Sequence, residues 1–451
     1  MKIKTELLPY QRDAYNKLVR LKVGALYMEM GLGKTRTALE IIQHRLEAEK
    51  LNKVLWLCPC SVKNNLRVDL QKHADGTEDL IRICGIETLS SSDKTYMNLL
   101  QYVGSGSVML IVDESNLVKN YFSIRTKRIT ALSKTCRYKM ILNGTPVTRN
   151  EADLYSQWYI LDQRIFGYRS FYSFKANHLE YDKFGHVRRV LNVDYLTEKI
   201  APYSYVIRKD DAIKLPPKHY QEEKFYLTES QQHEYAEVLD MLLSQVDEFD
   251  SSTIYRLFTG LQLVTSGREV WQERKNRHSD YHLKSCPFFD DPQQNPRIRA
   301  LLNVLDEEKT LIWVKFVFEI EDIKKVLPAG SYALFYGGVP LKKRMQELER
   351  FRTDPECRYL IASKTCGGYG LNLQYCRNAV YYNNDFDYAT RAQSEDRLHR
   401  IGQTRDVYIT DISAVSKIDI RILENLSHKD DLCECMKKCI REKKDIKEWL
   451  S

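Results

Sequence analysis

The chain has 451 residues, of which 43% are hydrophobic and 29% charged, a balance that excludes a disordered chain. Its length suggests about two to three domains. With 69 Lys and Arg against 61 Asp and Glu, the formal charge is +8, which permits a phosphate-backbone partner. The apolar runs are far shorter than the roughly 20 residues of a membrane helix, and the first residues lack a signal-peptide core, so we expect neither secretion nor membrane insertion.

Short apolar runs rich in β-branched residues alternate with helical patterns. The first set of predicted strands begins at Gly24, Val54, Val108 and Tyr138, and the second set at Leu311, Tyr332, Tyr359, Ala379 and Val407. Such runs, without polar alternation, suit parallel strands covered by helices on both faces. Within the second set, apolar residues recur at helical spacing from Leu341 to Phe351, which predicts the strand–helix–strand unit of a parallel sheet.

The two strand-rich sets predict an α/β fold with two lobes and mostly helical insertions between their sheets. Residues 1–207 are expected to form the N-terminal lobe, with a helical protrusion around 150–200. Residues 208–295 are expected to form a connector and a helical insertion, because the sequence LPPK at 215–218 breaks any helix. Residues 296–451 are expected to form the C-terminal lobe, with a terminal helical brace.

A phosphate-binding loop is the first chemical signal. The segment GALYMEMGLGKT places four candidate residues between a predicted strand and a predicted helix: Gly31, Gly33, Lys34 and Thr35. Backbone N–H groups and a helix N-terminus in this context attract phosphate oxygens. Lys34 would reach the β and γ phosphates, and Thr35 would ligate Mg²⁺. The strict motif is incomplete, since Met28 stands where it has a glycine.

An acidic pair is the second signal. Asp113 and Glu114 stand at the end of the apolar run VMLIV, where open α/β sheets carry their ligands. Asp113 suits a contact to Mg²⁺, direct or through water, and Glu114 suits a base that orients and deprotonates the attacking water. An acidic pair in this place is also a common helix start, but the phosphate loop upstream favours the catalytic interpretation.

Cysteine and histidine spacing is less informative. Eleven Cys without paired CxxC knuckles predict reduced thiols rather than a zinc site or disulfides. His278, His282 and Cys286 are spaced so that they would align on one face of a helix. A metal site there is one interpretation, and a solvated polar insertion is the other.

Several segments, taken in order, resemble those of a known superfamily. LLPYQRDA, MEMGLGKT, IVDESNLVKN and ILNGTPVTRN are similar to the first lobe of superfamily-two helicases. YGGVPLKKRMQELERF, SKTCGGYGLNL and QSEDRLHRIGQT resemble later motifs of the Swi/Snf-related ATPases. This resemblance, over nearly the whole chain, implies two RecA-like lobes and a DNA-dependent ATPase. The chain departs from the family at Ser115 and Asn116, usually Ala-His, and at Asn143, frequently Thr.

The resemblance also implies roles for single residues. Gln11 would contact the adenine of ATP, and Gly370 and Gln393 would belong to the nucleotide site. Arg397 and Arg400 are three apart on a predicted helix and therefore on one face. They would reach ATP bound on the first lobe and stabilise the charge that develops on its γ-phosphate.

DNA contacts are expected at matching places in both lobes. Ser61, Lys63 and Asn64 follow a strand end where the family touches backbone phosphates, and Lys364 and Thr365 occupy the corresponding place in the second lobe. The same residue types populate any loop, so a merely structural role is the alternative. The aromatic segment RIFGYRSFYSFKANH is expected to form the core of a helical protrusion rather than to stack on bases.

Together these signals predict a motor that uses ATP and Mg²⁺ and moves along double-stranded DNA. One alternative is an ATP-binding nucleic-acid clamp, favoured by Asn116 and Asn143, and another is a strand-separating helicase acting with a partner protein. RNA unwinding fits the acidic box and the HRIGQ segment less well. We expect a monomer in the absence of DNA and no membrane contact. We expect a cytoplasmic location in a bacterial or viral-host setting, or a nuclear one in a eukaryote.

Overall fold

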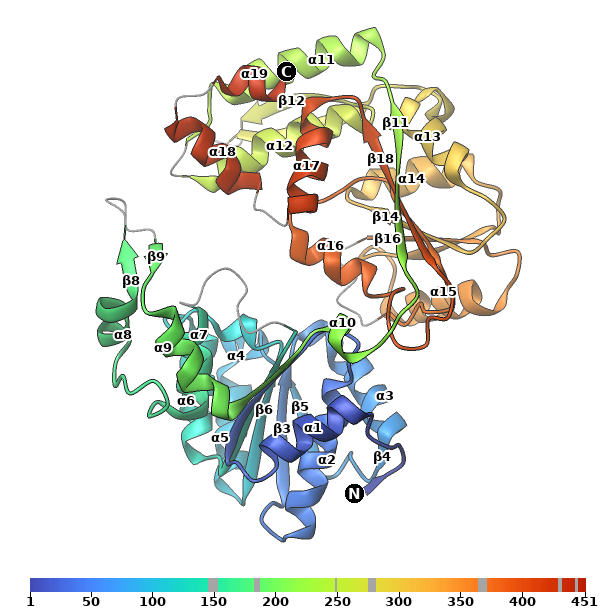
Figure 1. Ribbon diagram of the computed structural model, residues 1–451. Helices are drawn as coiled ribbons and strands as arrows, with labels where there is room; N and C mark the ends of the chain where they lie inside the picture. Colours follow the sequence, from blue (N-terminus) through green and yellow to red (C-terminus); the bar gives the residue numbers. More distant parts are fainter. Residues whose placement is uncertain are drawn as a thin grey trace. The chain divides into compact units, whose positions relative to one another are not determined.

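The computed structural model divides into two compact units, unit one (Met1–Lys214) and unit two (Leu215–Ser451) (Figure 1). The residues that it describes are 1–144, 153–181, 187–247, 250–274, 281–363, 371–428, 432–442 and 445–451. Each unit is built on a parallel sheet with helices, so the predicted α/β fold with two RecA-like lobes is confirmed. The predicted division into residues 1–207, 208–295 and 296–451 stays a prediction.

In unit one, six described strands form the sheet in the order β10-β2-β7-β6-β3-β5, and each neighbouring pair is parallel. Their bounds are β2 Val23–Met28, β3 Lys53–Cys58, β5 Ile81–Gly85, β6 Val108–Asp113, β7 Tyr138–Asn143 and β10 Ser204–Ile207. The four strands expected from apolar runs are confirmed. The sequence did not indicate β5 and β10, which lie at the sheet edges, where the apolar pattern is weaker.

Helices cover both faces of this sheet (Figure 1). One face carries α1 Pro9–Leu18, α2 Lys34–Glu47 and α3 Lys63–His73. The other carries α4 Thr88–Ser91, α5 Asp93–Gly104, α6 Ile124–Thr135 and α7 Leu154–Asp162. Each face of the sheet has its own hydrophobic core. Along β6, Met109 is buried on the face covered by α1, α2 and α3, and the next residue, Leu110, is buried on the opposite face. This two-sided burial explains the uninterrupted apolar runs.

The remaining elements of unit one are small. They are the antiparallel pairs β1 Lys2–Ile3 with β4 Ala74–Asp75 and β8 Leu179–Tyr181 with β9 Val187–Val190, and the helices α8 Phe171–His178, α9 Val193–Ile200 and α10 Lys209–Ala212. Phe166 and Phe174 are buried in the hydrophobic core that includes one face of the sheet, and Phe171 packs against it, while the predicted protrusion around 150–200 stays a prediction. The expected core role of these aromatic residues is confirmed.

In unit two, six described strands form a second parallel sheet in the order β11-β18-β17-β14-β16-β15. Their bounds are β11 Lys218–Phe225, β14 Thr310–Val314, β15 Tyr332–Phe335, β16 Tyr359–Ser363, β17 Asn378–Tyr381 and β18 Val407–Ala414. The five strands expected from apolar runs are confirmed. β11 reads KHYQEEKF, and its polar side chains suit an edge strand with an exposed face.

Residues before Pro296 contain more strand than the sequence suggested. Helices α11 Glu229–Leu243 and α12 Ser251–Thr265 are followed by an antiparallel hairpin of β12 Arg268–Arg274 and β13 Tyr281–Pro287. His282 and Cys286 lie on β13, so their Cα atoms are about 13 Å apart along the strand. The predicted helical alignment of these residues is therefore wrong, and His278 lies outside the described residues.

The other helices of unit two belong to its hydrophobic cores, and the last two of them pack mainly on other helices, including α11 and α12. They are α13 Pro296–Val304, α14 Val317–Val326, α15 Leu341–Thr353, α16 Tyr388–Glu395, α17 Lys417–His428, α18 Leu432–Arg441 and α19 Ile446–Leu450. The helix expected between β15 and β16 is confirmed as α15. Among the described residues, none of the helices has both the length and the apolar character needed to cross a bilayer.

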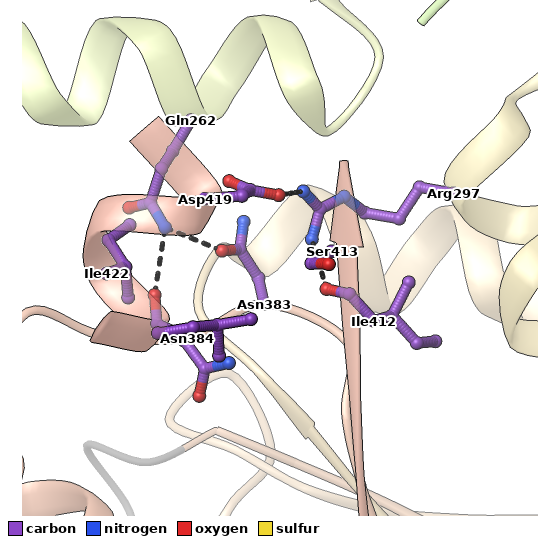
Figure 2. Close-up of a pocket in the computed structure, with 9 residues that line it drawn as sticks. Gln262, Arg297, Asn383, Asn384, Ile412, Ser413, Asp419 and Ile422 are labelled. Atoms are coloured by element: carbon purple, nitrogen blue, oxygen red, sulfur yellow. Dashed lines mark hydrogen bonds and ion pairs between the residues drawn. The ribbon is translucent and has the colours of Figure 1, made fainter. Parts of the chain in front are cut away.

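A buried arginine fastens α13 to α12, α17 and the end of β18 (Figure 2). Arg297 is 1% exposed, and its guanidinium donates to Thr265 O and Oγ1 at 3.0 Å, to Tyr382 O at 2.6 Å and to Ile412 O at 3.3 Å. It also forms an ion pair with the buried Asp419. The small cavity beside it is lined by side chains that include Gln262, Asn383 and Asn384. Every N–H of the guanidinium is thus satisfied within the core, so Arg297 has a structural role.

The substitution Arg297→Met is expected to lower the free energy of unfolding of unit two by about 3 to 5 kcal/mol, because Asp419 would be left as a buried, unpaired carboxylate. Urea unfolding followed by circular dichroism measures this loss. Arg299→Met, two residues along the same helix at an exposed position, is the matched control. Equal stability of the two variants would contradict the proposed role of Arg297.

Candidate functional site

The loop between β2 and α2 has the backbone of a phosphate-binding loop. Gly31 and Gly33 have φ angles of 84° and 78°, in the left-handed region that favours glycine. A Cβ atom at Gly33 would lie 2.3 Å from Nε2 of Gln11, so a larger residue there would also displace the Gln11 side chain. Helix α2 begins at Lys34, and the N–H groups of its first turn need partners from outside the helix.

Three side chains surround this loop. Lys34 Nζ donates to Met28 O at 2.9 Å, which holds the ammonium group over the loop. Gln11, buried on α1, donates from Nε2 to Leu32 O at 2.9 Å and accepts from Leu8 N at 3.0 Å. Gln11 therefore braces the loop itself, and its adenine contact stays a prediction. Thr35, in the first turn of α2, is half-buried beside Lys34.

The acidic pair lies at the same edge of the sheet as the phosphate loop. β2 and β6 are separated by β7 alone and all three are parallel, so their carboxyl ends share one edge. Glu114 has φ 49° and ψ 57°, a left-handed conformation that costs energy for a residue with a side chain. Its N–H donates to Asp113 Oδ1 at 3.0 Å. This conformation turns the chain sharply at the strand end and presents both carboxyl groups at the edge.

The charge at this edge is unbalanced. Burial, and then the neighbouring Glu114, raise the pKa of Asp113 to about 7, against the opposing effect of Lys34. Two carboxyl groups beside one ammonium group favour an added cation, and carboxylate and hydroxyl oxygens are ligands that Mg²⁺ accepts. Asp113 and Thr35 therefore fit the predicted metal-binding role by chemistry.

Two of the three residues that depart from the family pattern, Ser115 and Asn143, form side-chain hydrogen bonds within unit one. Ser115 is buried, and its Oγ donates to Gln157 Oε1 at 2.5 Å. Gln157, on α7, donates in turn to Asp153 O at 2.9 Å. Asn143 at the end of β7 accepts from Gly144 N at 2.8 Å. Sequence reasoning singled out Ser115 and Asn143 but missed Gln157, because no local pattern connects residues so far apart in the chain.

The residues expected to contact DNA in unit one are at the end of β3, which neighbours β6 in the sheet. Ser61 belongs to the short 3₁₀ helix Cys60–Val62, and Lys63 begins α3. Asn64 is exposed and accepts from Arg67 Nη1 at 2.9 Å. The structure thus brings the three predicted residues to a helix N-terminus at the carboxyl edge of the sheet. Lys364 and Thr365, the predicted counterparts in unit two, lie outside the described residues.

The arginine segment of unit two departs from the predicted helix. Helix α16 ends at Glu395, and Arg397 and Arg400 lie in the turn that follows, residues 396–403, called here the arginine turn. Leu373 N donates to Arg397 O at 3.0 Å, and Arg400 donates to Leu371 O at 3.4 Å. The predicted alignment on one helix face is wrong, because these contacts with residues 371–373 replace the helical pattern.

Burial differs among the predicted residues of unit two. Arg397 is buried, Arg400 is half-buried and Gln393 is exposed on α16. Gly370 lies outside the described residues. The approach of Arg397, Arg400 and Gln393 to a nucleotide on unit one stays a prediction.

Two family models match parts of the chain, and the first of these matches extends from unit one into unit two. Residues 76–276 match the SNF2-related domain, and residues 294–402 match the helicase conserved C-terminal domain. The chain belongs to the Swi/Snf-related ATPases of the superfamily-two helicases. Members are helicase-type hydrolases that act on ATP, which agrees with a phosphate loop and an acidic pair at one sheet edge.

Among curated relatives of this Swi/Snf-related chain, the ATP-dependent helicase MG018 of Mycoplasma genitalium is 23% identical over 91% of this chain and 40% of its own length. MOT1 of Saccharomyces cerevisiae, a TATA-binding protein-associated factor, is 22% identical over 93% and 27%. The chain therefore spans less than half of either relative. The solved Sulfolobus solfataricus SWI2/SNF2 ATPase core in complex with dsDNA is 20% identical, with a TM-score of 0.43 and coverage of 97% of this chain and 94% of that one.

The raised pKa of Asp113 predicts that the free energy of unfolding depends on pH, because ionising this buried carboxyl group destabilises the folded protein. The folded protein keeps a proton that the unfolded chain releases between about pH 4 and 7, so wild-type stability falls as the pH rises through that window. Asp113→Asn should therefore raise the Tm of the nucleotide-free protein more at about pH 8 than at about pH 5.5. Differential scanning calorimetry measures both values. The exposed Asp79→Asn is the control, and an equal shift in both variants would contradict the prediction.

Proposed function

We propose that this Swi/Snf-related chain couples ATP hydrolysis to movement along double-stranded DNA. The supporting observation is that the phosphate loop, the acidic pair and the segment Ser61–Asn64 gather at one edge of the sheet of unit one. A nucleotide and a nucleic-acid backbone bound at one edge can each respond to the other, because the strands between them form one rigid sheet. Unit two contributes the arginine turn.

In the proposed reaction, Lys34 and the N–H groups at the start of α2 bind the β and γ phosphates. Thr35 and Asp113 would hold Mg²⁺, which offsets phosphate charge when bound. Glu114 accepts a proton from the attacking water and orients it toward the γ-phosphate. Its left-handed backbone supports this role, since strain of this kind is retained where a side chain must be aimed.

The arginine turn supplies positive charge as the γ-phosphate leaves. Arg397 and Arg400 are the proposed donors, and an arginine in this role is worth about 10³ to 10⁵ in rate in comparable enzymes. Because ATP would then be held by both units, its hydrolysis would release one unit from the other. Alternating closure and release moves the protein if each unit holds a separate stretch of DNA backbone.

DNA binding is proposed at Ser61, Lys63 and Asn64 in unit one. A helix N-terminus, a lysine and polar side chains together suit phosphate oxygens, and the net charge of +8 favours a polyanion. Lys364 and Thr365 are the proposed contacts in unit two. Backbone contacts of this kind carry no base information, so we expect little sequence preference.

Triplex displacement tests the proposed movement directly. The wild type should displace a third strand from duplex DNA only with ATP, whereas Glu114→Gln should hydrolyse ATP about 10² to 10⁴ times more slowly and displace none. Lys34→Ala should fail at both, because the γ-phosphate loses its ammonium partner. Lys50→Ala, at an exposed position just past α2, is the control and should behave as the wild type.

Two other outcomes would replace the proposal. ATP binding with DNA retention but no ATP-driven displacement would identify a static clamp, the function suggested by Asn116 and Asn143. Separation of a forked duplex into single strands would identify a strand-separating helicase. Full hydrolysis by Lys34→Ala or Glu114→Gln would remove the assigned site altogether.

Arg400→Ala tests the role of the arginine turn. ATP affinity should change by less than about threefold, while DNA-stimulated hydrolysis should fall by about 10³-fold or more, because the lost charge acts mainly in the transition state. Nucleotide binding is measured with a fluorescent ATP analogue and turnover by phosphate release. The exposed Arg405→Ala is the matched control. An equal loss of binding and of turnover would argue against a transition-state role.

A further inference from the structure

The first residues of unit two are fastened to the arginine turn and to the elements beside it. Four consecutive residues, 216–219, take part. The carbonyl oxygens of Pro216 and Pro217 contact His399 Nε2 at 2.8 Å and Val407 N at 3.0 Å. Lys218 Nζ contacts Glu395 Oε2 at 2.8 Å, and His219 Nε2 contacts Asp406 Oδ2 at 2.9 Å. This segment continues as β11, which pairs with β18 along its whole length. The first residues of unit two thus form hydrogen bonds and ion pairs with the arginine turn and its neighbours directly after the unit boundary.

Glu395 is the centre of these contacts. As the last residue of α16 it accepts from Lys218 Nζ and from Tyr220 OH, at 2.9 Å, on one carboxyl oxygen, and from Arg391 Nε at 2.8 Å on the other. Arg391 also donates to both carboxyl oxygens of Asp411, at 2.5 and 3.0 Å. Two cations and two carboxylates therefore balance one another across α16, β11 and β18.

This balance keeps the network charged. Burial alone would raise the pKa of Glu395, but the Arg391 and Lys218 charges outweigh it and hold that pKa below its ordinary value. The side chain of Glu395 is only 8% exposed, and a buried carboxylate that loses one of its cations becomes costly. The network consequently resists displacement of Glu395, and Lys218 is its charged member on β11, beside the hydroxyl of Tyr220.

The position of Glu395 is passed directly to the arginines. Both Leu398 N and His399 N donate to Glu395 O at 3.0 Å, and Leu398 is fully buried in the core. Arg397 and Arg400 flank these two residues. A shift of Glu395 therefore moves the backbone from which both guanidinium groups extend, and misplacement of catalytic groups by about 1 Å can cost about 10²-fold in rate.

We propose that Lys218 and Glu395 are positioning residues for the arginine turn, so that the connector strand β11 sets the place of Arg397 and Arg400. The inference rests on the proposed role of these arginines in ATP hydrolysis. Neither Lys218 nor Glu395 needs to touch the nucleotide. The connector is also the covalent link from unit one. A displacement of the connector would therefore move Arg397 and Arg400 through the contact between Lys218 and Glu395.

Hydrogen exchange tests the physical part of the inference without ATP. In Lys218→Met, amides of residues 396–403 should exchange roughly tenfold faster than in the wild type, because Glu395 loses its charged partner on β11 and is left there with the hydroxyl of Tyr220. Lys224→Met is the matched control, since Lys224 is on the same strand but exposed, and it forms a surface ion pair with Glu222. Unchanged exchange in Lys218→Met would overturn the proposal.

Kinetics test the functional part. Lys218→Met should lower the kcat of DNA-stimulated hydrolysis by about 10- to 100-fold with the KM for ATP within about threefold. Lys218→Arg, which keeps the charge, should regain most of the rate, and Lys224→Met should match the wild type. Rates are compared at temperatures where calorimetry shows each variant folded, so that lost stability does not mimic lost positioning.

The two proposals fail differently. A wild type without DNA-stimulated hydrolysis would refute the proposed function. The exchange experiment would then test by itself whether Lys218 and Glu395 hold the arginine turn in place. An active wild type with an inactive Lys34→Ala, but with full turnover in Lys218→Met, would refute only the positioning role. An equal loss of turnover in Lys218→Arg and in Lys218→Met would also contradict the positioning role, because the positive charge at this position would then have no effect on the rate.

Discussion

Parallel pairing of the strands is the constraint on which the candidate site depends. When neighbouring strands run in one direction, every loop that leaves a carboxyl end is delivered to the same edge. In unit one this brings together segments that are about 80 residues apart in the chain, from Gly33 to Asp113. Hydrophobic burial on both faces of the sheet stabilises this arrangement and leaves the edge free to hold polar and strained residues.

Electrostatics at that edge are arranged for a ligand rather than for stability. Asp113 and Glu114 repel one another in a partly desolvated place, and Lys34 offsets only part of the charge. At two places in unit two, by contrast, a buried arginine is paired with buried carboxylates, Arg297 with Asp419 and Arg391 with Glu395 and Asp411. The contrast supports a catalytic role for the acidic pair, because uncompensated charge is retained where a cation or a substrate completes the set.

The two compensated clusters of unit two have different consequences. The Arg297 cluster joins helices to the core, so its loss would affect the whole unit. The cluster around Glu395 joins the connector to the turn that carries Arg397 and Arg400, so its loss would affect the placement of the arginines. A buried ion pair is weak support for stability as such, but it fixes geometry well, since its members cannot be displaced singly without exposing an unpaired charge.

The amino-acid sequence by itself determined the strands buried on both faces, the phosphate loop and the acidic pair, because each is encoded by neighbouring residues. Tertiary structure decided β11, whose polar sequence becomes a strand only beside β18, and the hairpin that places His282 and Cys286 on a strand. It also ended α16 before Arg397, where hydrogen bonds to residues 371–373 outweigh a helical pattern. Local sequence patterns indicate which side chains are buried and which lie in a binding loop. The pairing of edge strands and the positions of helix ends depend instead on partners that lie far away in the sequence.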